Sequence, residues 1–171
     1  GWQIILNPTR VVDGQYDLWL PSENVLNRGT GFLYPDEEVT LTIPSTADKE
    51  ISVGAYDALT FSYASYTGRG YTWQDERTKP DLVAPGVNVR TTAVGGGVTV
   101  VSGTSFATPF VTGASALLME WGIVRGNDPF LYGEKVKAYL RRGARELPGF
   151  GKYPNREVGY GRLCLERSLP D

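Results

Sequence analysis

Residues 103–109 carry the side chains whose types and spacing are best suited to chemistry. They read Gly-Thr-Ser-Phe-Ala-Thr-Pro, and apolar residues follow at helical spacing up to Gly122. This pattern predicts a helix over residues 105–121 that ends at Gly122. We expect Pro109 near its first turn, where a missing N–H costs little. Ser105 would then lie beside unpaired N–H groups, which favour an oxyanion next to its Oγ.

A serine in this place also fits a purely structural role. A serine hydroxyl becomes an effective nucleophile when a general base, most often histidine, removes its proton, and the chain contains no histidine. Serine and threonine are also favoured helix N-caps, so Thr104 or Ser105 could simply cap a buried helix. Helix geometry alone favours the capping interpretation.

The flanking residues favour the chemical interpretation instead. The order Gly-Thr-Ser-x-Ala-x-Pro resembles the serine motif of the subtilisin-like serine peptidases, the subtilases. Upstream, residues 79–87 resemble the subtilase segment before the nucleophile, and residues 51–56 resemble a buried strand of the subtilase sheet. The resemblance covers roughly residues 48–165. It implies a serine endopeptidase that acts on protein or peptide, with Ser105 as nucleophile and with Thr104 and the Ser105 amide at the oxyanion hole.

The chain departs from the subtilase pattern in the residues that complete catalysis. The resemblance implies an Asp, a His and an oxyanion Asn on segments before the serine motif. The chain has no His and no Asp-Ser/Thr-Gly triplet, and Phe110 stands where the family often has a His. We therefore expect that Gly1 is not the natural start, that the chain is the C-terminal fragment of the peptidase, and that it is inactive alone. The alternative is a catalytically dead subtilase-like or jelly-roll binding module.

The first 47 residues differ from the rest in pattern. Short apolar or alternating runs lie at residues 2–6, 16–20, 32–34 and 39–43. Turn-forming residues separate them, as is typical of antiparallel β-structure. We place a domain boundary at residues 44–47, with a β-rich piece over 1–47 and an α/β piece over 48–171.

This layout defines the expected fold class. We expect an α/β chain, the C-terminal part of a subtilisin-like parallel-sheet fold, preceded by antiparallel strands. The layout resembles the clostridial type of subtilase, which includes the spore germination proteases. In that type, residues 1–47 would be the last strands of a jelly-roll insertion. The resemblance suggests a bacterial extracellular or spore-associated location.

Composition limits the other function classes. The chain has 171 residues, 41% hydrophobic and 21% charged, which is ordinary for one globular domain. A net charge of −2 argues against a nucleic-acid partner, and no apolar run approaches 18 residues, so we expect no membrane span. Cys164 is the single cysteine and is expected to be a small buried hydrophobe, so we expect no metal site. No cofactor is expected.

Several tempting features are best interpreted as scaffold. Gly95, Gly96 and Gly97 lack the Lys-Ser/Thr ending of a phosphate loop and predict a hairpin turn. The acidic run at residues 36–38 is expected to be solvated, and Trp2, Trp19 and Trp73 are expected in the core rather than as a sugar platform.

A second helix is predicted over residues 133–142. Its Lys135, Lys137, Arg141 and Arg142 are expected to form a solvated face. The apolar flanks of the helix at 105–121 are expected to need a partner, either the missing N-terminal part or a second copy.

Overall fold

The computed structural model divides the chain into two units. It describes residues 5–14, 16–21, 25–72 and 77–170. The units are Gly1–Pro35 and Asp36–Asp171, so the division falls before the boundary expected at residues 44–47. Residues of the acidic run belong to the second unit because they bind it: Glu37 pairs with Arg69 at 2.5 Å and Glu38 pairs with Arg69 at 3.5 Å. The expectation that this run is merely solvated is therefore wrong for Glu38, whose side chain is 36% exposed, whereas Glu37 pairs with Arg69 while its side chain stays 80% exposed.

In the described part of the first 47 residues, the expected antiparallel strands are not formed. Within the described part of that segment, residues 16–20, 32–34 and 39–43 adopt no strand. A strand needs a ladder of hydrogen bonds to a neighbour through its N–H and C=O groups. In the described part of these runs Thr40 N donates to Arg69 O at 3.0 Å, but no strand forms there. Most of their apolar side chains are exposed, including Trp19 at 53%, whereas Leu41 is buried at 8%. The core position expected for Trp19 is wrong, and Trp2 and Trp73 lie outside the described residues.

The second unit contains the expected parallel strands. β1 (Val53–Tyr56) pairs with β4 (Leu82–Pro85) in parallel, from Val53 opposite Leu82 to Tyr56 opposite Pro85. Both strands are short apolar runs and almost wholly buried, as parallel strands usually are. β2 (Gly70–Tyr71) and β3 (Thr78–Lys79) form a small antiparallel pair on the connection between them. The α/β class predicted for this unit is confirmed.

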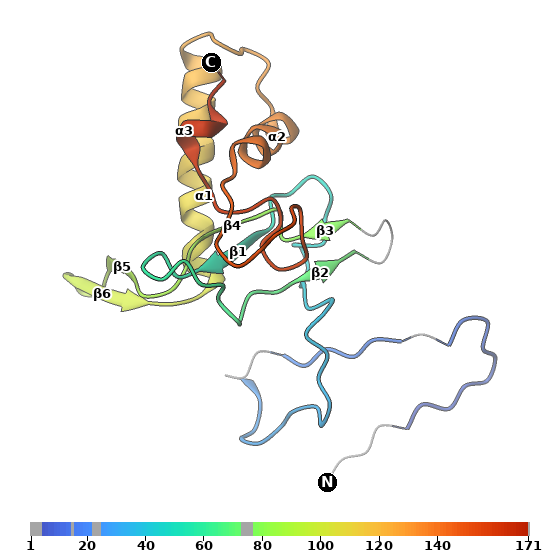
Figure 1. The fold of residues 1–171 in the computed structure, drawn as a ribbon. Coiled ribbons are helices and arrows are strands. Elements are labelled where there is room, and N and C mark those ends of the chain that lie inside the picture. The colour runs from blue at the N-terminus through green and yellow to red at the C-terminus, as the bar shows by residue number, and fades with distance from the viewer. Residues whose placement is uncertain (1–4, 15, 22–24, 73–76, 171) are drawn as a thin grey trace. The chain divides into compact units, whose positions relative to one another are not determined.

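The hairpin predicted at the three glycines is also confirmed. β5 (Val89–Thr92) pairs antiparallel with β6 (Val98–Val101), and the hairpin projects beside the start of α1 in Figure 1. The turn residues 95–97 have φ angles of 83°, 100° and 82°. Side chains rarely adopt this left-handed region, which explains why three glycines occupy it.

The helix that follows begins one residue earlier than predicted and ends later. α1 (Thr104–Met119) continues into a π-helical turn, η2 (Glu120–Val124). Gly122 lies buried inside that turn, so its predicted role as a helix stop is wrong. A Cβ on Gly122 would lie 2.7 Å from the Leu131 side chain, so this glycine allows close packing. The chain leaves the helix at Gly126, whose φ is 75°.

Pro109 lies in the second turn of α1, further along than expected. In a regular helix its N–H would donate to the Ser105 carbonyl, four residues earlier. Proline has no N–H, so that carbonyl lacks its helical donor. The proline therefore lies inside the helix rather than marking its start.

One face of α1 forms the centre of the core. Its buried residues Ala107, Val111, Ala114 and Leu118 recur at helical spacing and belong to the cluster that includes Ala55 of β1 and Leu82 of β4. By length and composition alone, Thr104–Val124 would be apolar enough to cross a membrane, although the sequence shows no unbroken apolar run of that length. The buried stripe instead makes α1 the helix on which the parallel strands pack.

Two further helices cover α1. α2 (Gly133–Gly143) confirms the helix predicted at 133–142, and α3 (Leu165–Ser168) lies against it. Val136 and Leu140 of α2 join the core cluster of α1. Lys137 does not belong to the expected solvated face, because it is only 6% exposed, whereas Arg142 is exposed as expected.

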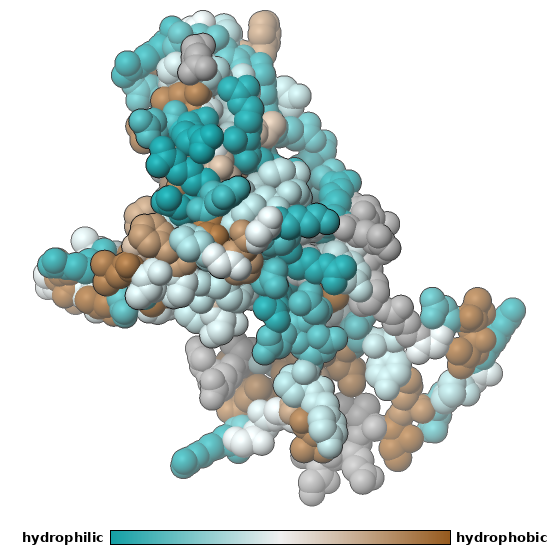
Figure 2. Space-filling view, viewed as in Figure 1, coloured by the Kyte–Doolittle hydropathy of each residue, from teal (hydrophilic) through white to brown (hydrophobic). Residues whose placement is uncertain are grey.

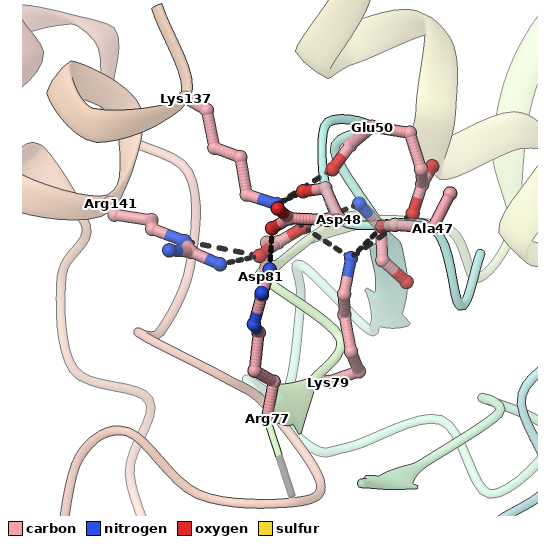
Figure 3. A network of polar contacts seen from close by, with 9 residues as sticks. Ala47, Asp48, Glu50, Arg77, Lys79, Asp81, Lys137 and Arg141 are labelled. Atoms are coloured by element: carbon pink, nitrogen blue, oxygen red, sulfur yellow. Dashed lines mark hydrogen bonds and ion pairs between the residues drawn. The ribbon is translucent and has the colours of Figure 1, made fainter. Parts of the chain in front are cut away.

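A buried carboxylate, Asp81, connects these elements (Figure 3). Asp81 is fully buried just before β4, and its Oδ2 accepts the Ser52 N–H at 2.7 Å. Lys79 and Lys137 each place Nζ 3.2 Å from the same oxygen, and Arg141 donates to Oδ1 from Nε at 3.0 Å and from its terminal nitrogen. The expectation that Lys137 and Arg141 are solvated is wrong because both side chains form ion pairs with the Asp81 carboxylate.

The two lysines also bind the segment before β1. Lys79 donates to Ala47 O at 3.1 Å and to the Glu50 carboxylate at 3.2 Å. Lys137 donates to Asp48 O at 2.8 Å and to Glu50 O at 2.7 Å. The ammonium groups therefore join α2, β3 and the residues 47–50 around a single acid.

The surroundings of Asp81 keep it ionised. Burial alone would raise the pKa of the Asp81 carboxyl, but the Ser52 N–H, the Arg141 guanidinium and the Lys79 ammonium hold it below its ordinary value. For Lys137, burial lowers the pKa of the ammonium, and the Asp81 charge offsets that shift only in part. The carboxylate is thus stabilised in its charged form by the folded structure.

Asp81→Asn should destabilise the chain by about 3–5 kcal/mol, because it leaves buried cations without their counter-charge. Urea unfolding followed by tryptophan fluorescence measures the loss. Glu166→Gln is a matched control, since Glu166 pairs with Arg145 at 3.3 Å but its side chain is 84% exposed. This surface change should leave the free energy of unfolding almost unaltered.

The difference between wild type and Asp81→Asn should depend on pH. A carboxyl whose folded pKa is lowered contributes stability above its unfolded pKa, about 3.9, and loses it as pH falls through the folded pKa. The wild-type advantage should therefore be full at neutral pH and shrink below about pH 4. An advantage that stays constant down to pH 2 would contradict this account of Asp81.

Candidate functional site

The turn from β6 into α1, residues 102–106, carries the candidate serine. Gly103 is the N-cap of α1, with φ 150° and ψ 157°, and no side chain caps the helix. Thr104 and Ser105 are already helical, so neither acts as the N-cap. The capping role that helix geometry favoured is therefore not the role of Ser105 in this fold.

Ser105 lies exposed on the first turn of α1, and Thr104 beside it is partly buried. Within the described residues, Ser105 Oγ has no hydrogen-bond partner, and the Thr104 and Ser105 N–H groups have no acceptor. The next amide, of Phe106, donates to Gly103 O at 3.1 Å. The exposed hydroxyl thus has free amides and the positive end of the helix dipole at its side, which suits a developing negative charge.

The parallel strands hold this turn at their carboxyl ends. Gly103 N donates to Gly86 O at 2.8 Å, and Gly86 N donates to Tyr56 O at 3.0 Å, at the ends of β4 and β1. Asn88 N donates to Ser102 Oγ at 2.9 Å. The carboxyl edge of an α/β sheet is where such folds usually place their sites.

Gly86 makes the close approach of strand and helix possible. A Cβ at this position would lie 2.5 Å from Ala55 Cβ, 3.1 Å from Gly103 O and 3.3 Å from Ala107 Cβ. Ala55 and Ala107 are both fully buried, so neither has room to move. The small residues of β1, β4 and α1 therefore decide how near Ser105 lies to the strand ends.

A hollow of about 270 Å³ lies beside the serine turn. β5 lines it with Val89, Arg90 and Thr91, and α1 lines it with Phe106, Pro109 and Phe110. Phe110, at the position where the family often has a His, is 43% exposed there. Its ring cannot accept a proton, so this position supplies no base.

The described residues place the Ser105 hydroxyl beside unpaired amides and show no base within reach of it. No imidazole exists in the chain, and Ser105 Oγ bonds to no described carboxylate. Among the described residues, no group of three or more Cys, Asp or Glu side chains is placed to hold a metal ion. The arrangement can therefore present a serine for acyl transfer but cannot remove its proton unaided.

Sequence reasoning missed one contact of the serine turn. Tyr66 Oη donates to Gly86 O at 2.8 Å from a loop far from the motif in sequence. Tyrosine in a loop carries no spacing signal of its own. The only available signal was the meeting of the two motifs at Gly86 and Gly103, which leaves the Gly86 carbonyl able to accept a second hydrogen bond.

Comparison with protein families identifies a match over most of the chain. The model of the subtilase family, Peptidase S8, matches residues 33–161. This range contains β1, β4, the serine turn and α1.

Curated relatives agree with that match. The mouse membrane-bound transcription factor site-1 protease is 37% identical over 134 residues, which is 75% of this chain and 12% of that protein. The serine protease AprX of Bacillus subtilis is 32% identical over 156 residues, which is 80% of this chain and 33% of AprX. The chain thus spans a third or less of these two relatives.

A solved structure resembles the fold closely. The Clostridium perfringens CspB protease superposes with a TM-score of 0.79 at 48% identity, over 84% of this chain and 30% of that one. The self-cleaved protease domain of PatA superposes with a TM-score of 0.58 at 29% identity, over 74% of this chain.

Gly86→Ala should destabilise the fold by about 1–3 kcal/mol and displace the serine turn, because its Cβ has no space. Gly113→Ala is the matched control: Gly113 is in α1, and no heavy atom lies within 4 Å of an added Cβ. That change should stabilise the helix by about 0.5–1 kcal/mol. Thermal unfolding measures both, and equal stability of the two variants would show that Gly86 is not tightly packed.

Proposed function

Because the chain belongs to the subtilase family of serine proteases, we propose that the whole protein is a serine endopeptidase that cuts peptide bonds through an acyl-enzyme on Ser105. The observation that carries this proposal is the position of Ser105, exposed on the first turn of α1 with unpaired amides beside it. A serine that only capped a buried helix would need neither an exposed hydroxyl nor unpaired amides beside it.

The proposed reaction assigns a role to each group in turn. Ser105 Oγ attacks the scissile carbonyl carbon while a base takes its proton. The carbonyl oxygen becomes an oxyanion that accepts the Ser105 N–H, with Thr104 next to it. The tetrahedral intermediate collapses, the C–N bond breaks, and the amine leaves with the proton from the base. Water then hydrolyses the ester.

The base and its partners come from residues outside these 171. The chain has no histidine, and we propose that the whole protein supplies His, Asp and the oxyanion Asn from another segment. A protein or peptide is the proposed substrate. The isolated chain is then inactive, since loss of the base alone lowers kcat by about 10⁶-fold in such a triad.

The subgroup is also a proposal. The 48% identity to the Clostridium perfringens CspB protease supports the clostridial type. On this view residues 1–47 end a jelly-roll insertion, and residues 48–171 carry the nucleophile. The exposed apolar side chains of the described residues 5–14, 16–21 and 25–35 support that view, because strands of a jelly roll would bury such side chains against the rest of the insertion.

The outer face of α1 supports the idea that a further part of the protein covers it. Phe110, Leu117, Met119 and Ile123 lie outside the buried stripe, and each is at least 42% exposed. Figure 2 shows apolar side chains also gathered on the neighbouring β5–β6 hairpin. We propose that the rest of the catalytic domain covers this face in the whole protein, and that a second copy covers it when the chain is alone.

A fluorophosphonate probe tests the nucleophile. Ser105 should displace its fluoride and become phosphonylated in the full-length protein, and intact mass spectrometry should detect the adduct. Ser105→Ala should remain unlabelled. The isolated chain should also stay unlabelled under the same conditions, because it lacks the base.

If the full-length protein is not labelled at Ser105, the peptidase proposal is wrong. That result would favour the alternative, a subtilase-like or jelly-roll module that binds without cutting. Labelling of the isolated chain at the full-length rate would instead show that a base lies within these residues.

Light scattering tests whether the isolated chain self-associates through the exposed apolar residues of α1. The isolated chain should scatter as a species larger than its 18.7 kDa monomer, and Phe110→Gln with Leu117→Gln should shift it toward the monomer. Val94→Gln is the control, because Val94 is fully exposed at the hairpin tip, away from α1. A clean wild-type monomer would contradict the proposed self-association.

A further inference from the structure

The loop between β1 and β2 reaches the serine turn through the side chain of Tyr66. Tyr66 Oη donates to Gly86 O at 2.8 Å, the same carbonyl that accepts the Gly103 N–H at 2.8 Å. A backbone carbonyl has two lone pairs, so these two donors use its full capacity. The Gly86 carbonyl thereby joins three separate segments of the chain.

This carbonyl lies in the middle of a series of peptide hydrogen bonds. Gly86 N donates to Tyr56 O at 3.0 Å, Gly103 N to Gly86 O at 2.8 Å, and Phe106 N to Gly103 O at 3.1 Å. Ser105 lies between Gly103 and Phe106, so the last links of the series determine where its amide and hydroxyl point.

The Tyr66 phenol is held in its donor form. Burial raises the pKa of Tyr66, and the Asp57 charge raises it further, whereas the backbone of Gly103 acts in the opposite direction. The hydroxyl therefore keeps its proton at neutral pH.

We infer that Tyr66 is a positioning residue for the reactive serine, which it aligns through the Gly86–Gly103 hydrogen bond. Tyr66 holds the N-cap of α1 against the end of β4 and so keeps Ser105 Oγ and the Ser105 N–H in their attacking geometry. Small misplacements of a nucleophile cost large factors in rate. This inference rests on the proposed function of Ser105.

Tyr66→Phe removes the hydroxyl alone and leaves Gly86 O with its Gly103 donor. Tyr63→Phe is the matched control, because Tyr63 Oη donates to Thr67 O at 2.9 Å within the same loop and away from the serine turn. Fluorophosphonate labelling of the full-length protein then separates the rate of phosphonylation from probe affinity. In Tyr66→Phe the rate should fall about tenfold with unchanged affinity, and in Tyr63→Phe neither should change.

Hydrogen exchange supplies a second readout that does not depend on activity. The peptide covering residues 101–107 should exchange faster in Tyr66→Phe than in wild type or Tyr63→Phe, with no change elsewhere and no change in Tm. A purely structural role would lower Tm and raise exchange throughout the protein.

The outcomes are distinct from those of the proposed function. A wild-type protein that labels, with Tyr66→Phe labelling at the same rate, overturns the inference and leaves the peptidase proposal intact. Unchanged exchange of residues 101–107 overturns it whether or not the wild type labels. If the wild type does not label, the proposed function fails, and faster exchange confined to Tyr66→Phe still supports alignment of the serine turn by Tyr66.

Discussion

The carboxylate of Asp81 is the interaction on which the rest of the second unit depends. It is fully buried, yet it stays charged because an amide from before β1 and cations from β3 and α2 surround it. A buried ion pair is costly to form, so it contributes specificity of arrangement more than net stability. Asp81 joins the segment before β1 and the start of β4 to α2, and this arrangement helps to position the strand ends that carry the site.

The ends of β1 and β4 position the serine turn through close packing of small residues and through shared hydrogen bonds. Gly86 lies between Ala55 and Ala107 with no space for a Cβ, so β1, β4 and α1 meet there at close range. Its amide and carbonyl connect Tyr56 with Gly103, and Tyr66 adds a third donor. Ser105 itself is exposed and unpaired within the described residues. Its geometry is therefore decided by neighbours that do not react.

Local patterns were sufficient where the contacts are local. Apolar spacing predicted α1 and α2, and the three glycines predicted the β5–β6 turn, since each depends on residues close in sequence. The strands expected before residue 47 failed because a strand needs a partner that alternation cannot guarantee. Lys137 and Arg141 were misjudged because their acid lies more than fifty residues away, 60 for Arg141. Gly122 was misjudged because Leu131 approaches it from outside the helix.

The sequence by itself determined the family, through three motifs in a characteristic order, and it determined which serine stands at the start of a helix. It also determined that no imidazole in this chain can serve that serine. Only the tertiary structure decided that Gly103 rather than Thr104 or Ser105 is the helix N-cap, and that Lys137 is buried. It also decided that Tyr66 donates to Gly86 O, the carbonyl that accepts the Gly103 N–H. The physical reason is the range of the interactions: helical spacing and turn geometry are written in neighbouring residues, whereas burial and hydrogen-bond partners depend on segments that only folding brings together.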